Sequence, residues 1–151
     1  MNPILLLLHL AGVIIWVGGM FFAHFCLRPV AAAQLPPAQR LPLLAAVLGR
    51  FFRAVAASVV AILLSGFAGM MVTGFARAPL HWHAMAGIGL VMMAIFGIVH
   101  HRYYPRLKAG AARQDWPAAG AALNRIRQLV ALNLLLGGLT LCVATLGGHF
   151  G

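Results

Sequence analysis

The chain has 151 residues, of which 63% are hydrophobic and 8% are charged, and its mean hydropathy is +0.96. Soluble domains carry about 25% charged residues, so this composition excludes an ordinary soluble protein. The net charge of +10 would suggest nucleic acid in a soluble chain. Here the basic residues lie beside long apolar segments, and we expect no nucleic-acid partner.

Four apolar segments predict four transmembrane α-helices. A spanning helix needs about 20 consecutive apolar residues, because only a helix satisfies its backbone hydrogen bonds in hydrocarbon. The segments are residues 4–27, 54–75, 80–100 and 128–148, and none contains Asp, Glu, Lys or Arg. The first lacks a preceding positive charge and a cleavage site, so we expect it to stay as a helix. The expected fold is all-α, a four-helix transmembrane bundle forming a single domain over residues 1–151.

The basic residues predict the orientation of the bundle. They follow the first and third spans, whereas the segment between the second and third spans carries Arg77 alone. The others are Arg28, Arg40, Arg50, Arg53, Arg102, Arg106, Lys108, Arg113, Arg125 and Arg127. By the positive-inside rule, we expect the first and third loops in the cytoplasm and both termini outside.

The loops themselves are expected to be short amphipathic helices. Residues 41–53 mix apolar side chains with arginines and are predicted to lead directly into the second span. Residues 107–113 and 118–127 are predicted to extend the third and fourth spans, with a turn at 115–117.

Histidines are the candidate functional residues. The chain has a single acidic residue, Asp115, so paired carboxylates and a Ser-His-Asp triad are excluded and no hydrolytic activity is expected. It has seven histidines, and ionisable side chains inside spans are functional candidates by default.

The spacing of four histidines predicts two tiers of axial ligands. His9 and His24 lie fifteen residues apart on the first span, about 22 Å at helical rise and offset by about 60°. His83 and His101 lie eighteen residues apart on the third span, about 27 Å and five full turns. We therefore expect an outer tier of His9 and His83 and an inner tier of His24 and His101.

The remaining histidines are secondary candidates. His81 and His83 differ by about 200° around a helix, so one of them is expected to face outward. The same argument applies to His100 and His101. His149, at the outer end of the fourth span, is a further candidate for the outer tier, although its glycine-rich tail argues against this role.

Imidazole is a good ligand for both copper and haem iron, and the residues do not decide between these two metals. Copper would be taken at the outer face by His9 and His83 with His81, near thioether sulfurs. Those methionines are Met70, Met71 and Met85. Haem b groups would instead bridge the two histidines of each tier and carry electrons across the membrane, or support a haem-dependent oxidation. A third alternative is a scaffold without a metal, whose basic face binds anionic lipid headgroups.

Several motifs carry a resemblance to a known family. They are Leu8-His9-Leu10-Ala11, Ile15-Trp16-Val17-Gly18-Gly19, Arg28-Pro29, Arg50-Phe51-Phe52-Arg53, His81-Trp82-His83 and Tyr104-Pro105-Arg106-Leu107. In these the chain resembles the copper-resistance D (CopD) family of bacterial inner-membrane proteins. The resemblance implies copper handling, by binding, transport or resistance, in the bacterial inner membrane. Larger members carry additional spans, so this chain is a minimal form, for which we expect a homo-oligomer and a periplasmic copper or electron-transfer partner.

The early histidine of the first span is also similar to that of the bacterial membrane protoporphyrinogen oxidases, which are four-helix haem b proteins. That family places a lysine in its second span, and the segment 54–75 has no ionisable residue. This difference weakens the oxidase interpretation.

Overall fold

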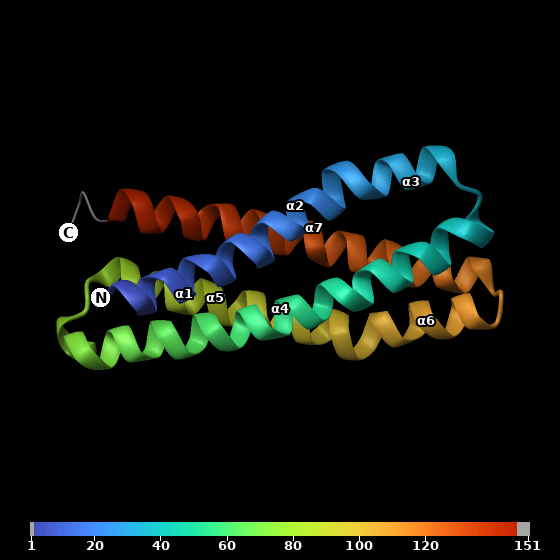
Figure 1. Cartoon of the computed structure of the whole chain (residues 1–151). Coiled ribbons are helices and arrows are strands. Elements are labelled where there is room, and N and C mark those ends of the chain that lie inside the picture. Colours follow the sequence, from blue (N-terminus) through green and yellow to red (C-terminus); the bar gives the residue numbers. More distant parts are fainter. Residues whose placement is uncertain (1, 148–151) are drawn as a thin grey trace.

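Four long helices run antiparallel through the structure, a computed structural model that describes residues 2–147 (Figure 1). Across these residues the four continuous helical segments are 3–34, 37–73, 80–112 and 116–147, and each is long and apolar enough to cross a membrane. The prediction of an all-α transmembrane bundle is therefore confirmed.

The first helix contains two π-helical turns. It consists in order of α1 (Pro3–Val13), η1 (Ile14–Gly18), α2 (Gly19–Phe22), η2 (Ala23–Leu27) and α3 (Arg28–Gln34). Its start is capped by Asn2, whose side-chain oxygen accepts a hydrogen bond from the Ile4 backbone N–H at 2.9 Å. The helix continues seven residues beyond the predicted span end at Leu27.

Prolines explain two of the π turns in the structure. Pro29 follows η2, and Pro105 follows η4 (Val99–Tyr103) in the third helix. A helical proline lacks an N–H, and its ring collides with the carbonyl four residues earlier. That carbonyl belongs to a residue of the π turn in both cases. The wider π turn relieves the collision, so that each helix passes through its proline without breaking.

The second helix confirms that residues 41–53 lead directly into the second span. α4 (Pro37–Thr73) runs without interruption from the loop through the second span, and it ends at Gly74, whose φ of +84° favours glycine. A short η3 (Phe75–Arg77) connects it to the third helix.

The last two helices form a hairpin. α5 (Leu80–Ile98) continues through η4 into α6 (Tyr104–Ala112), and α7 (Trp116–Gly147) returns. The turn was predicted at 115–117 but lies earlier, because α7 already begins at Trp116. Pro117 occupies the second position of α7, where a missing N–H removes no helical hydrogen bond.

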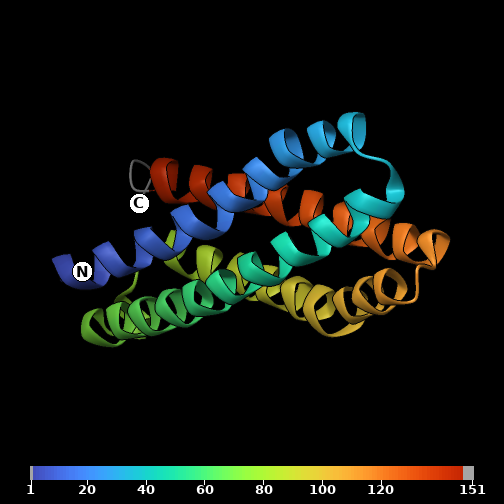
Figure 2. The ribbon, with the colours of Figure 1, turned by 45° about the vertical axis from the view of Figure 1, so that its right-hand side comes forward.

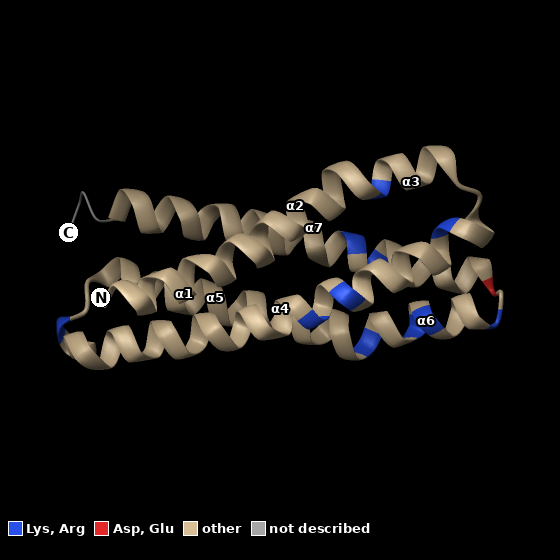
Figure 3. Cartoon of the chain, viewed as in Figure 1, with Lys and Arg blue, Asp and Glu red and all other residues tan. Residues whose placement is uncertain are grey.

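The bundle has two distinct ends, which we call the termini end and the turn end. The N-terminus, residue 147 and η3 lie at the termini end, and the turns at 35–36 and 113–115 lie at the turn end (Figure 1). Lys and Arg gather in the half of the bundle nearer the turn end (Figure 3), whereas Arg77 ends η3 at the termini end.

Packing is concentrated toward the turn end. α1 packs on α4, α5 and α6 pack on α7, and α4 also contacts α6; Figure 2 shows the same arrangement from a second direction. The larger buried cluster joins the loop-side parts of α4, η4, α6 and α7. Its buried members are Leu41, Ala45, Leu48, Phe52, Val99, Leu107, Ala119, Ala122 and Ile126. A smaller cluster of Trp16, Met20, Val55 and Met92 fills the middle of the bundle.

Candidate functional site

A close approach of α1 to α4 positions His9. One turn further along α1, a Cβ added to Gly12 would lie 2.8 Å from Ile62 Cγ1 and 3.0 Å from the Ser58 carbonyl oxygen. Glycine therefore lets the two helices touch, and the half-buried His9 ring is brought against the face of α4.

A hydrogen bond to Ser65 fixes the tautomer of His9. His9 Nδ1 lies 3.0 Å from Ser65 Oγ, and Ser65 is 1% exposed. Ser65 Oγ also lies 2.6 Å from the Ala61 carbonyl oxygen, which can only accept. Since the hydroxyl has one proton and donates it to Ala61, it must accept from His9 Nδ1–H. Neutral His9 therefore carries its lone pair on Nε2, the nitrogen that faces away from Ser65.

A glycine of α4 lies against this ring, and a methionine follows that glycine by one helical turn. A Cβ on Gly66 would lie 3.5 Å from His9 Cε1, so the edge of the imidazole rests on a glycine. Met70 follows Gly66 by one turn on the same side of α4 and is half-buried, whereas Met71 is 60% exposed. The thioether of Met70 is thus the soft donor that α4 offers beyond His9 toward the termini end.

The other outer-tier candidates lie at the start of α5. His83 is exposed, and its Nε2 donates to the Phe75 carbonyl oxygen at 3.1 Å, which leaves the lone pair on Nδ1. His81 is half-buried and lies against α7, where a Cβ on Gly147 would come 2.5 Å from His81 Cβ. His149 lies outside the described residues.

The inner-tier candidates lie nearer the turn end. Of the two neighbours, His101 is exposed and His100 packs into the bundle, with ring centroids 5.9 Å from Phe52 and 5.7 Å from Phe96. Its Nδ1 is buried without a hydrogen-bond partner among residues 2–147. This aromatic surrounding was not foreseen from the sequence.

His24 has basic surroundings. It is half-buried on η2, its ring stands edge-on to Phe25 at 4.9 Å, and Arg28 and Arg127 lie within electrostatic range. The predicted offset of about 60° between His9 and His24 assumed an uninterrupted α-helix. The structure has two π turns between these residues, which change the rotation accumulated along the helix.

The histidines make separate local contacts. His9 is hydrogen-bonded to Ser65 of α4 and His83 to Phe75, and His81 lies against α7. In the part of the chain that the structure describes, no three His, Cys, Asp or Glu side chains lie together in a group that could hold a metal ion. The two-tier arrangement and its ligand sets therefore stay predictions.

A small polar position lies at the centre of the bundle. Asn133 on α7 is 3% exposed, and its Nδ2 donates to the Met92 carbonyl oxygen at 3.1 Å. Its Oδ1 has no hydrogen-bond partner within the described residues, and it borders a cavity lined also by Trp16 and Met20.

Comparison with known proteins gives one match. The family model described as Copper resistance protein D matches residues 45–146, which is more than half of the chain. No curated protein and no solved structure matches. The matched range includes Ser65, His81 and His83, and it begins after His9.

Proposed function

The chain belongs to the copper resistance protein D family, and from this premise we propose that it binds copper ions within the membrane, with His9 as a ligand at the termini end. It is a multi-pass membrane protein related to copper resistance. The observation that supports His9 is its hydrogen bond to Ser65 at 3.0 Å.

That hydrogen bond is the arrangement expected of a metal ligand. Histidines that bind metals usually donate the other ring N–H to a protein oxygen, which fixes the ring and raises its basicity. Ser65 plays this part for His9 and leaves Nε2 for the ion. Copper accepts imidazole and, as copper(I), thioether sulfur, so the half-buried Met70 is the second donor that we propose from α4. His83 offers Nδ1 from α5 as the alternative second donor.

We also propose how the bundle is oriented and in which membrane it lies. The basic turn end faces the cytoplasm by the positive-inside rule, so the His9 site opens on the periplasmic side of a bacterial inner membrane. Copper is then cargo that arrives from the periplasm, delivered by a periplasmic partner. A homo-oligomer would supply the further spans that larger relatives carry in one chain.

The test is copper retention by the purified, detergent-solubilised protein, measured by elemental analysis and by X-ray absorption at the copper edge. His9→Ala is expected to abolish retention, and Ser65→Ala is expected to weaken affinity about 10-fold to 100-fold while leaving the ligand set intact. Met70→Leu should remove a sulfur scatterer. Met71→Leu, the exposed neighbour, is the matched control and should change nothing.

Three results would overturn the proposal. Unchanged copper retention by a well-folded His9→Ala variant would remove His9 from the site. A Soret band that shifts on reduction, with iron in proportion to protein, would replace copper by the haem b alternative. A protein that retains no metal and needs none would favour the scaffold alternative instead.

A further inference from the structure

The hairpin of α6 and α7 forms a groove at the turn end. The two helices meet at Gly110, where an added Cβ would lie 2.9 Å from the Ala119 backbone nitrogen. Small residues next to this contact form the floor of a groove of about 600 Å³. They are Ala109, Gly110, Ala118, Ala121 and Ala122.

Arginines line the walls of this groove. Arg102, Arg106 and Arg113 come from the third helix and the turn, and Arg125 comes from α7. All four are exposed. The groove also contains Asp115, so four positive charges face one negative charge.

The single carboxylate caps a helix, and two of the four arginines lie over an aromatic ring. Asp115 Oδ1 accepts a hydrogen bond from the Ala118 backbone N–H at 3.1 Å, which caps α7. The guanidinium carbons of Arg102 and Arg106 each lie 5.9 Å from the centroid of the Tyr103 ring. Two of the groove cations are thus placed over an aromatic face instead of being paired with an acid.

The position of the groove identifies the source of its ligand. Arg102 comes two residues after the predicted end of the third span, and Arg125 three residues before the predicted start of the fourth. By these predicted boundaries, this end of the groove lies at the depth of the lipid headgroups, where tyrosine is also enriched. Guanidinium forks match phosphate oxygens in two-point hydrogen bonds, and basic pockets between helices on the cytoplasmic side bind anionic headgroups.

We propose that this groove binds the phosphodiester headgroup of an anionic phospholipid from the cytoplasmic leaflet. Arg102, Arg106 and Arg125 contact the phosphate, and the alanine floor lets the headgroup lie close to the helix backbones. The proposal depends on the orientation given above and not on copper binding.

The test uses the full chain in detergent micelles, titrated with phosphatidylglycerol or phosphatidylcholine, with bound lipid counted by native mass spectrometry. Wild-type protein should retain phosphatidylglycerol in preference to phosphatidylcholine. The double variant Arg106→Gln/Arg125→Gln should bind phosphatidylglycerol at least about tenfold more weakly, because charged hydrogen bonds to the phosphate are lost. Arg106→Lys/Arg125→Lys, which keeps the charge and loses the fork, should fall between.

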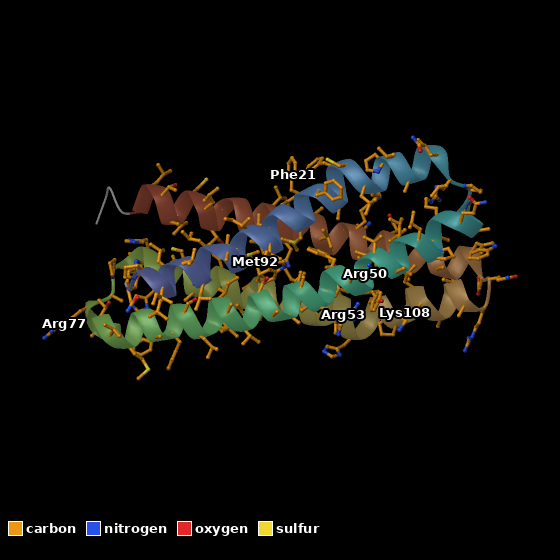
Figure 4. The ribbon with its side chains drawn as sticks, in the orientation of Figure 1. Phe21, Arg50, Arg53, Arg77, Met92 and Lys108 are labelled. Carbon is orange, nitrogen blue, oxygen red and sulfur yellow. The ribbon has the colours of Figure 1, made fainter. Side chains whose placement is uncertain are left out.

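Arg50→Gln/Arg53→Gln is the matched control. Both of these arginines are exposed, project from α4 and do not line the groove (Figure 4). The control loses the same charge as the groove variant and should keep the preference for phosphatidylglycerol. Helical circular dichroism of each variant checks that the fold is intact.

Three results would overturn the proposal. Equal loss in the control would show that overall charge and not the groove attracts the lipid. Equally tight binding of inorganic phosphate or glycerol phosphate in the same mass spectrometry titration would make the ligand a free anion. Undiminished binding by the Arg106→Gln/Arg125→Gln variant would place the lipid elsewhere.

Discussion

Gly110→Ala tests the contact on which the hairpin of α6 and α7 is built. A Cβ at this position would lie 2.9 Å from Ala119 N and 3.0 Å from both Ala119 Cα and Cβ. Two of these atoms belong to the backbone, so a rotamer change cannot relieve the collision and the two helices must separate. Forcing an extra methyl group into a packed contact destabilises by about 1–3 kcal/mol.

Helix propensity acts in the opposite direction. Alanine is favoured over glycine by about 1 kcal/mol in a helix interior. Gly120→Ala, on the facing helix, isolates this effect, because no described atom lies within 4 Å of its added Cβ. Gly120→Ala should therefore be neutral or stabilising. The two variants should differ by the packing penalty alone, about 1–3 kcal/mol or about 5-fold to 150-fold in the unfolding constant.

Reversible unfolding in mixed micelles, followed by helical circular dichroism and tryptophan fluorescence, measures both variants. Trp116 packs against the buried cluster of this hairpin and reports on its opening. A Gly110→Ala variant as stable as Gly120→Ala would refute the close contact at Gly110 and, with it, the shape of the arginine groove.

Three further substitutions should change stability by amounts that the contacts set. Gly12→Ala should destabilise the fold by about 1–3 kcal/mol, because the added Cβ collides with α4. Gly18→Ala should not, because no atom of the described residues lies within 4 Å of its added Cβ. Thermal melting in detergent compares the two variants. Asp115→Ala should lower the unfolding free energy by about 0.5–2 kcal/mol through loss of the α7 cap, and Asp115→Asn should retain most of it. Asn133→Leu removes one interhelical hydrogen bond together with a buried amide oxygen that lacks a protein partner. The free energy of unfolding, measured at equilibrium, should therefore change by no more than about 1 kcal/mol. A decrease of more than twice that amount would assign the amide a larger structural role.

The spans were predictable because an apolar segment in hydrocarbon can satisfy its own backbone hydrogen bonds only as a helix. Long apolar segments without charges must form helices, and the amphipathic residues 41–53 continue the helical pattern into the second span. The first helix extends beyond the predicted span 4–27, which was drawn as an uncharged segment and so stops just before Arg28-Pro29. The structure passes through Pro29 with the π turn η2, a local geometry that the sequence pattern does not reveal.

The site could be predicted only in part. His9 is identifiable from the sequence because an ionisable residue in a span is rare. Its partner Ser65 lies 56 residues away, and the pair forms because α1 packs on α4. Sequence periodicity does not say which helix becomes the neighbour. The choice between His100 and His101 likewise depends on one residue of helical rotation inside η4, where the π geometry departs from the usual repeat.

The distribution of the buried clusters implies that two different forces hold this bundle together. Most of the larger cluster, from Leu41 to Phe52 and from Leu107 to Ile126, lies outside the predicted spans, where water is the alternative environment. The hydrophobic effect therefore stabilises that part as it does in a soluble bundle. Within the spans, lipid chains are as apolar as leucine, and the helices must rely on close glycine contacts and a few hydrogen bonds. Urea should accordingly loosen the turn end first, and a change of lipid should act mainly on the termini end, where His9 lies.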